Sequence, residues 1–337
     1  MATFIRPIAT AMELPPTSHF GSVFPVLFTT RRSLSYERGP GGMPSRLTPV
    51  RVLRAFVRTM RPKQWTKNLL VVAAPLAAGK LFERGVFGPT LLAFLAFCSV
   101  ASAVYAVNDC ADRVADRAHP RKRHRPVAAG ELSVRAALVG AALLLVVGVA
   151  LGLAADPALA ELLLAYAALQ VAYALWLKHE PVIDLAIVTA GFLMRAVAGG
   201  LAADLPISQW FLLVAGFGSL FIVSGKRYSE LHTLGSEAGT RRSLVRYTDT
   251  YLRFTWSIAA AATVMSYSLW AFEMASGSGV PWHTLSIAPF VVGLLRYAVD
   301  IDAGEAAEPE DIVWGDRVLQ AVGVLWLGLV CLGVIGA

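Results

Sequence analysis

The amino-acid sequence predicts an all-α integral membrane protein with nine transmembrane helices. Of its 337 residues, 56% are hydrophobic and only 16% are charged, whereas a soluble domain carries about a quarter charged residues. The apolar residues gather in long spans, as a helix that crosses a bilayer requires. The Lys and Arg residues cluster between these spans rather than within them. These three features together exclude an ordinary soluble fold.

Residues 1–45 contain Pro, Gly and Ser without helical periodicity, and we expect them to form a disordered N-terminal extension. Their best apolar stretch, Phe20–Phe28, is broken by Pro25 and makes a poor signal-peptide core. Met43 precedes a well-formed sequence, so translation from Met43 stays an open alternative. We expect residues 46–337 to form one transmembrane domain.

This domain begins with a basic, amphipathic segment at residues 50–60, which is expected to lie as a helix on the inner membrane surface. Of the nine apolar spans that follow, the first is short and contains Pro75, and several others are long enough to cross the bilayer. The spans lie at about 68–82, 88–107, 134–154, 158–177, 181–201, 209–225, 251–273, 282–299 and 317–336.

The positions of Lys and Arg orient the bundle. Eleven of them precede the first span, seven lie at 113–135 and six at 226–253. The loops that follow the odd-numbered spans hold only Lys80 and Arg84. Loops rich in Lys and Arg stay on the cytoplasmic side of a membrane. The N-terminus and these loops are therefore expected in the cytoplasm, and the C-terminus on the outside. The net charge of +7 is therefore explained by a multi-pass protein of the cell membrane, without a nucleic-acid partner.

The most informative motif, NDCADRVAD at 108–116, ends the second span. Asn108, Asp112 and Asp116 are spaced i, i+4, i+8 and share one face of a continuing helix, which Asp109 borders. Like charges in this arrangement call for a cation, and all-oxygen ligands suit Mg²⁺ that carries a substrate phosphate. We predict Asn108, Asp112 and Asp116 as metal-binding, catalytic residues and Asp109 as a substrate-binding residue. Removal of either aspartate should end turnover and leave the fold intact. An ordinary solvated helix end is the alternative.

A basic loop, RAHPRKRHRP at 117–126, follows directly. The positive charge of this loop helps to keep it on the cytoplasmic side of the membrane. Its position beside the carboxylates also suits binding of the outer phosphates of the same ligand. Arg123 and Arg125 are the candidates for this second role.

The combination of motifs resembles the UbiA superfamily of intramembrane prenyltransferases, and within it the actinobacterial branch that uses a phosphoribosyl donor. The likeness runs from about Pro49 to the C-terminus. Four segments carry it: RPKQWTKN at 61–68, 108–130, YALWLKHEPVID at 173–184 and GKRYSEL at 225–231.

The resemblance implies a UbiA-type bundle with a cytoplasm-facing active-site cavity. It also implies Mg²⁺-dependent transfer of phosphoribose from 5-phosphoribosyl 1-diphosphate to decaprenyl phosphate or another polyprenyl phosphate, with release of pyrophosphate, in the synthesis of cell-wall arabinan precursors. Such a reaction passes through an oxocarbenium-like transition state. The acceptor is already an anionic nucleophile, so no catalytic His or Ser is needed.

The resemblance also places further residues in the site. It implies that Tyr173 and Lys178 belong there, with Lys178 contacting a donor phosphate. Lys67 is favoured over Lys63 because it adjoins Asn68 at the membrane boundary. For these lysines, a snorkelling charge at a helix end is the alternative.

One segment departs from the pattern of the superfamily. Most members carry a second Asp-rich motif between spans six and seven for a second Mg²⁺, but here Lys226, Arg227 and Glu230 supply two cations and one carboxylate. We predict all three as substrate-binding residues, because fixed positive charge suits a donor with several phosphates. The alternative is that Lys226 and Arg227 only help to keep this loop on the cytoplasmic side of the membrane.

Arg195 lies inside the fifth span, 11 residues after Asp184, so the two side chains are expected on the same face. An ionisable group at this depth should face protein or a watery cavity. We favour a structural, hydrogen-bonded role for Arg195 over phosphate binding.

Seven acidic residues lie between Asp300 and Asp316. They could cap the basic cavity or be solvated, and we favour solvation.

Two other functions are weighed. An aromatic prenyltransferase of the same superfamily would predict a second carboxylate cluster, which 226–231 lacks. A transporter would predict inverted repeats or broken mid-membrane helices, and neither is clear. A homo-oligomer is compatible with the sequence.

Overall fold

The computed structural model describes residues 49–120, 122–234, 244, 246–274 and 280–335. The predicted extension at 1–45 lies outside these residues. Within them every regular element is helical, which agrees with the predicted all-α class. The long helices are α3 (Phe87–Ala111), α6 (Val134–Ala155), α7 (Pro157–Leu175), α8 (Ile183–Ala202), α9 (Gln209–Leu234), α11 (Asp249–Met274), α13 (Ile287–Asp302) and α15 (Arg317–Ile335).

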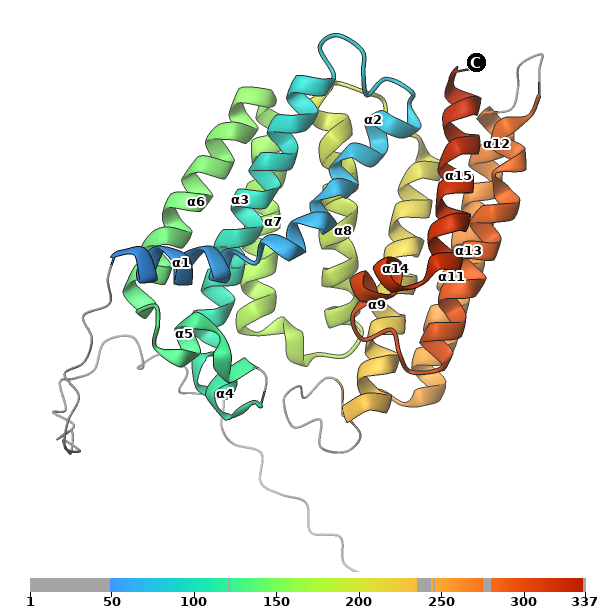
Figure 1. Cartoon of the computed structure of the whole chain (residues 1–337). Helices are drawn as coiled ribbons and strands as arrows, with labels where there is room; N and C mark the ends of the chain where they lie inside the picture. Colours follow the sequence, from blue (N-terminus) through green and yellow to red (C-terminus); the bar gives the residue numbers. More distant parts are fainter. Residues whose placement is uncertain (1–48, 121, 235–243, 245, 275–279, 336–337) are drawn as a thin grey trace, which may run out of the picture. The chain divides into compact units, whose positions relative to one another are not determined.

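Short elements connect and cover the long helices. They are α1 (Pro49–Met60), η1 (Pro62–Val72), α2 (Ala73–Ala77), α4 (Arg113–Ala118), η2 (Lys122–His124), α5 (Pro126–Ala129), η3 (Leu177–His179), α12 (Trp282–Leu285) and α14 (Pro309–Gly315). In Figure 1, α1 runs across the long helices, and α4 and α5 lie at the end of the bundle opposite the C-terminus. This end, where η3 also lies, is called the polar end below.

Among the described residues, seven segments are long and apolar enough to span a membrane: α3, α6, α7, α8, Gln209–Thr233, Trp282–Asp302 and α15. The chain is thus a multi-pass membrane protein, but the predicted count of nine spans is not confirmed. The expected first span is a short 3₁₀ helix, η1, followed by α2. The expected seventh span, α11, has the necessary length but carries many hydroxyl-bearing side chains.

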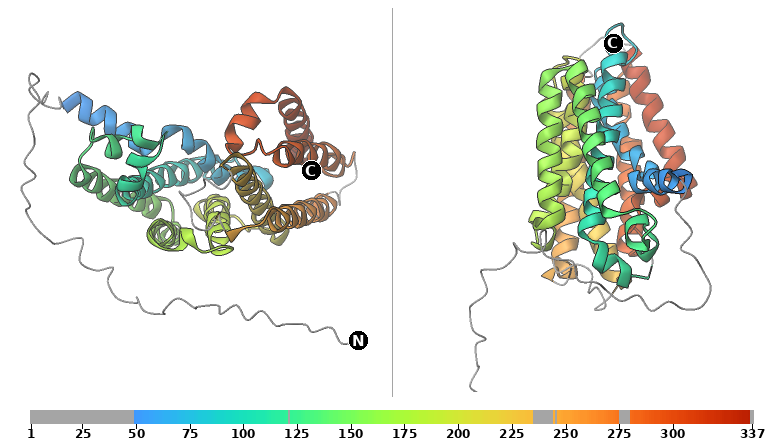
Figure 2. Two further views of the ribbon diagram at one scale, coloured as in Figure 1. Left: turned by 90° about the horizontal axis from the view of Figure 1, so that it is seen from below. Right: turned by 90° about the vertical axis from the view of Figure 1, so that its left-hand side faces the viewer.

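The long helices form two groups that α8 joins. One group is built on α3, which packs on α6 and α7, and the other on α9, which packs on α11. The view along the helices shows α3, α6 and α7 to one side, α11, α13 and α15 to the other, and α8 and α9 between them (Figure 2). Each group has its own apolar core, with Phe97 and Leu163 buried in the first and Phe221 and Leu252 in the second.

Close packing of η1 against α8 brings the irregular first span into the bundle. Pro62 begins η1 and Pro75 lies in α2, which disfavours a regular α-helix here. A Cβ atom on Gly199 of α8 would overlap the carbonyl oxygen of Val71, so the glycine is required for this approach. The polar residues of η1 are thereby held beside α3 and α8.

The amphipathic segment predicted at 50–60 is a helix, α1. Ala55 and Thr59 are buried against the bundle, while the apolar Val50, Leu53 and Val57 point outward and are exposed. An apolar outer face is what a helix at a membrane surface presents to lipid.

Candidate active site

The acidic motif lies where α3 ends and α4 begins. The predicted continuing helix is wrong in detail, because α3 ends at Ala111 and the backbone of Asp112 leaves the helical region. Helical spacing nevertheless persists through the bend: the Asp112 amide donates to Asn108 O at 2.9 Å, and the Asp116 amide donates to Asp112 O at 2.8 Å. The motif therefore stays together at the polar end.

Two of its carboxylates are buried and paired with arginines. Asp109 is 1% exposed and Asp116 3%. Arg125 Nη1 lies 2.7 Å from Asp116 Oδ2 and 3.3 Å from Asp109 Oδ1, and Arg61 also pairs with Asp109. Arg61 stacks on the ring of Tyr105, with its guanidinium carbon 5.0 Å from the ring centroid. Two positive and two negative charges balance, which makes their burial tolerable.

Sequence reasoning did not select Arg61, although it begins the first of the four recognised segments. Its backbone adopts φ 54°, a left-handed conformation, immediately before Pro62. A residue before proline normally adopts an extended backbone, so the surroundings must hold Arg61 in place. Its ion pair with Asp109 is one such restraint.

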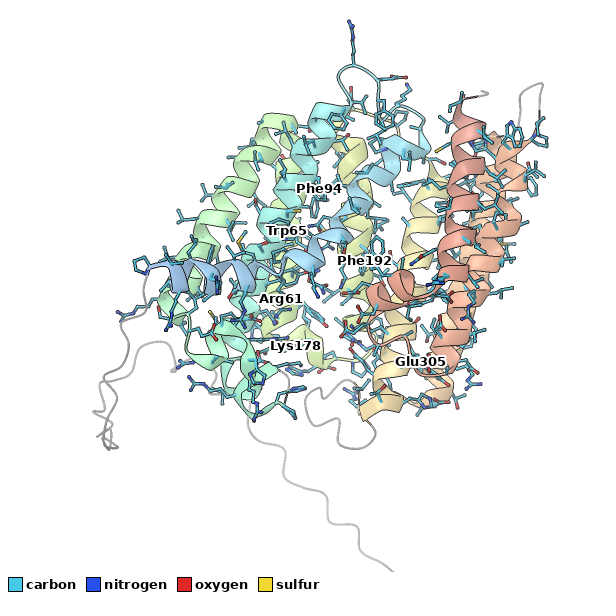
Figure 3. The ribbon with its side chains drawn as sticks, viewed as in Figure 1. Arg61, Trp65, Phe94, Lys178, Phe192 and Glu305 are labelled. Carbon is cyan, nitrogen blue, oxygen red and sulfur yellow. The ribbon has the colours of Figure 1, made fainter. Side chains whose placement is uncertain are left out.

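Asp112 is more accessible than the other two aspartates and pairs with Lys178 of η3. The structure thus brings together two residues that are 66 positions apart in the sequence. Of the two predicted arginines, Arg125 faces the carboxylates, whereas Arg123 is exposed and its Nε donates to His124. Figure 3 shows Arg61 and Lys178 in the same half of the bundle, with Phe94 towards the opposite end.

The donor set fits a magnesium ion that arrives with substrate. Within the described ranges, no three His, Cys, Asp or Glu side chains are grouped to hold a metal ion. Asn108, Asp112 and Asp116 nevertheless offer an amide and two carboxylates, and Mg²⁺ is commonly held by one or two carboxylates plus substrate phosphates. Both carboxylates are paired with cations here, so metal binding requires Lys178 and Arg125 to release them.

Arg227 is the centre of a buried network that links α7, α8 and α9. It is 3% exposed. Its Nε donates to Asp184 at 3.0 Å, its Nη1 to Glu230 at 2.7 Å and its Nη2 to the Tyr173 hydroxyl at 3.4 Å. Tyr247 also donates to Asp184. The guanidinium is thus engaged on every nitrogen by protein groups, which differs from the exposed cation that phosphate binding by Arg227 calls for.

Lys226 points towards the acidic segment that follows α13. Its Nζ donates to Ala307 O at 2.6 Å and lies 3.5 Å from Glu308 and 3.8 Å from Glu230. Four of the seven acidic residues are exposed, as the preferred interpretation of solvation expects, but the contacts of Lys226 show that the segment also packs against α9.

Glu310 of α14 forms an ion pair and a hydrogen bond with residues of η1. It lies 3.5 Å from Lys67 Nζ and accepts a hydrogen bond of 2.8 Å from Gln64 Nε2. Burial would raise the pKa of Glu310, but the charge of Lys67 and the hydrogen bond from Gln64 hold it below its usual value. Glu310 is therefore an ionised group between η1 and α9.

Arg195 has the hydrogen-bonded surroundings that we favoured. Its Nε donates to Asn68 Oδ1 at 2.8 Å, its Nη1 to Gly191 O at 2.7 Å and its Nη2 to the Tyr166 hydroxyl at 2.6 Å. Asp184 pairs instead with Arg227. Arg195 thus joins η1, α7 and α8 and stands apart from the acidic motif.

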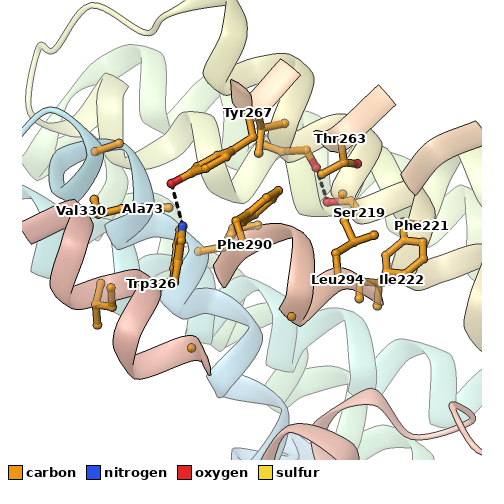
Figure 4. Close-up of a pocket in the computed structure, with 18 of the residues that line it drawn as sticks. Ala73, Ser219, Phe221, Ile222, Thr263, Tyr267, Phe290, Leu294, Trp326 and Val330 are labelled. Atoms are coloured by element: carbon orange, nitrogen blue, oxygen red, sulfur yellow. Dashed lines mark hydrogen bonds between the residues drawn. The ribbon is translucent and has the colours of Figure 1, made fainter. Parts of the chain in front are cut away.

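An apolar cavity of about 580 Å³ opens between η1, α2, α8, α9, α11, α13 and α15. Figure 4 shows part of its wall, including Ile222, Leu294, Phe290 and Tyr267, whose hydroxyl accepts a 2.7 Å hydrogen bond from Trp326. This size is typical of a ligand-binding cavity. The apolar lining excludes phosphates from its body and suits a hydrocarbon chain.

Known proteins share both the sequence and the fold. Residues 69–315 match the UbiA prenyltransferase family. A decaprenyl-phosphate phosphoribosyltransferase of Corynebacterium glutamicum is 46% identical over 297 residues, which cover 86% of this chain and 89% of the relative. One of Mycobacterium tuberculosis is 47% identical over 287 residues, which cover 84% and 95%.

Among solved structures, a UbiA homolog from Archaeoglobus fulgidus bound to GPP and Mg²⁺ has a TM-score of 0.64 and 19% identity. The match covers 84% of this chain and all of that chain. The same homolog bound to DMAPP and Mg²⁺ gives a TM-score of 0.66. At this identity the likeness concerns the fold.

Proposed function

The chain belongs to the UbiA prenyltransferase family, and we propose that it transfers phosphoribose from 5-phosphoribosyl 1-diphosphate to decaprenyl phosphate or another polyprenyl phosphate. The relatives that are 46% and 47% identical support this activity, because they are phosphoribosyltransferases over nearly the whole chain. The structural observation that carries the proposal is that one domain holds both the ion pairs of Asp112 with Lys178 and of Asp116 with Arg125 and, between other helices, an apolar cavity. Cations for a diphosphate and a cavity for a lipid then lie in one molecule.

The reaction breaks the bond between the anomeric carbon of the ribose and the diphosphate, and forms a bond from that carbon to an oxygen of the lipid phosphate. Asn108, Asp112 and Asp116 would hold Mg²⁺, which when bound neutralises charge on the leaving diphosphate. Lys178 and Arg125 leave their carboxylates and pair with diphosphate oxygens, so the growing negative charge meets fixed positive charge.

The other predicted substrate-binding residues divide by their surroundings. Tyr173, Arg227 and Glu230 form the buried network, so we assign them to holding α7, α8 and α9 in place around the donor. Asp109 positions Arg61 and Arg125, and Arg123 can reach an outer phosphate only from the surface. Lys67 and Lys226 each lie one helical turn from a residue of the cavity lining, Leu70 and Ile222 respectively.

We further propose nine membrane crossings, with η1–α2 and α11 added to the seven apolar segments. In this topology the N-terminus and the polar end face the cytoplasm of a plasma-membrane protein. The chain then makes precursors of cell-wall arabinan, and it is compatible with a homo-oligomer.

Purified protein, labelled phosphoribosyl diphosphate and polyprenyl phosphate test the activity. We expect Mg²⁺-dependent label in the organic phase and stoichiometric pyrophosphate. A parallel reaction supplies geranyl diphosphate and hydroxybenzoate. If the protein prenylates the aromatic acceptor and ignores the sugar donor, it is an aromatic prenyltransferase of the same family.

A further inference from the structure

The apolar cavity has polar groups at its mouth. Three elements, η1, α9 and α13, each supply an apolar residue of the lining and a polar residue of the mouth. On the 3₁₀ helix η1, Lys67 and Leu70 are three residues apart, a spacing that eclipses their side chains. On α9, Ile222 and Lys226 are four residues apart and share a face. In each pair the apolar residue lines the cavity and the lysine lies beyond it, towards the polar end. An apolar body with cations at one end matches a lipid that has an anionic head.

Tyr297 of α13 completes this mouth. It is 4% exposed and lines the cavity one turn beyond Leu294. Its hydroxyl has no hydrogen-bond partner within the part of the chain that the structure describes. A buried hydroxyl without a partner costs free energy, so a donor left in this state is suited to a ligand. The ring of Phe221, with its centroid 5.7 Å away, helps to hold the phenol in place.

Glu310 supplies the negative charge that this mouth attracts. Its carboxylate contacts Lys67 and Gln64, and it interacts electrostatically with Lys226 and with Tyr297. Four groups from η1, α9 and α13 thus surround a single carboxylate that α14 carries in. A carboxylate among cations and amide donors is the geometry that a phosphate oxygen would also satisfy.

We propose that Gln64, Lys67, Lys226 and Tyr297 form the subsite for the phosphate of the lipid acceptor, and that Glu310 fills this subsite until the lipid displaces it. The identification of the lipid as a polyprenyl phosphate rests on the proposed function.

Of the two proposed substrates, only the acceptor carries a hydrocarbon tail, and Lys67 and Lys226 each lie one helical turn from a residue that lines the apolar cavity. The sugar diphosphate has no group that suits the cavity, so it belongs with Lys178 and Arg125, which pair with the carboxylates of the acidic motif. Donor and acceptor then bind to separate groups of cations. This division changes the expectation from the sequence, where Lys226 was assigned to the donor.

The first test compares Tyr297→Phe with Tyr251→Phe, which removes an exposed hydroxyl from α11. Initial rates are measured against each substrate with the other saturating. Tyr297→Phe should raise KM for polyprenyl phosphate about tenfold or more and leave KM for the sugar donor unchanged, while Tyr251→Phe should change neither. A rise in donor KM with acceptor KM unchanged would overturn the assignment.

The second test measures binding of polyprenyl phosphate without any donor, with polyprenol and inorganic phosphate as comparison ligands. Glu310→Gln should bind polyprenyl phosphate more tightly than wild type, because a competing anion is gone. Asp311→Asn, the same charge change at the next, exposed residue, should bind as wild type does. Equal binding by wild type and Glu310→Gln would contradict the displacement.

These tests separate the two proposals. If wild type binds polyprenyl phosphate in a Tyr297-dependent way but transfers no phosphoribose, the proposed function fails and the subsite stands. If transfer occurs but Tyr297 and Glu310 affect only the donor, the function stands and the subsite is wrong.

Discussion

Asp112 and Asp116 belong to one motif but lie in different surroundings. The side chain of Asp112 is 28% exposed and that of Asp116 only 4%. The partner of Asp116, Arg125, also holds Asp109, so Asp116 is part of a buried charge cluster. From the sequence, removing either aspartate should leave the fold intact, and the structure supports this only for Asp112.

We expect Asp112→Asn to lower the transfer rate about 100-fold or more with little change in thermal stability. Asp116→Asn should lower the rate and also destabilise the protein by about 1–3 kcal/mol, because Arg125 loses a charged partner. Rates and thermal unfolding of the detergent-solubilised variants check both effects. Near-normal Mg²⁺-dependent turnover by Asp112→Asn would contradict its assignment.

At the scale of elements, the position of η1 depends on a glycine. Val71 of η1 packs against Gly199 of α8 so closely that no side chain fits between them. Because η1 carries Gln64 and Lys67, any shift of η1 also moves the mouth of the cavity.

Gly199→Ala should therefore lower stability by about 1–3 kcal/mol, since the new methyl group overpacks the contact. Gly216→Ala in α9 is the matched control, because a Cβ atom there meets open space. It should be neutral or slightly stabilising, as alanine favours a helix. Thermal unfolding of the two variants distinguishes them, and equal melting temperatures would show that η1 can move freely.

The contact between α14 and η1 depends on the ionised state of Glu310. Because its pKa is lowered on folding, chiefly by Lys67 against the opposing effect of burial, the carboxylate stabilises the fold fully above its ordinary pKa of 4.5. This contribution disappears as the pH falls through the lower, folded value.

Wild type should accordingly melt a few degrees above Glu310→Gln at pH 7, and the gap should close on acidification below about pH 4. Asp311→Asn serves as the control and should track wild type throughout. A gap that stays constant down to the lowest pH measured would mean that Glu310 contributes nothing through its charge.

At the scale of the whole molecule, the proposed topology has one consequence that is independent of chemistry. An odd number of crossings from a cytoplasmic N-terminus puts the C-terminus outside. A C-terminal alkaline phosphatase fusion should be active, and a fusion in the loop between α9 and α11 should be inactive. The reverse pattern would show that the charge distribution was misinterpreted.

The sequence by itself determined the properties that depend on local composition and spacing. Apolar spans predict membrane helices because hydrocarbon demands them, and the pattern of motifs identified the family. The metal-binding prediction for the motif at 108–116 likewise rests on residue types and spacing, whereas Lys178 was selected through the resemblance to the family.

Only the tertiary structure decided which charges meet. Arg61 reaches Asp109 across 48 positions, and Gln64 reaches Glu310 across 246. Tyr297 looks like any other tyrosine in an apolar span. Only the packing of α9 and α13 leaves its hydroxyl beside the cavity with no partner among the described residues. Such pairings follow from the packing of whole helices, and side-chain spacing within one segment carries no information about its distant neighbours.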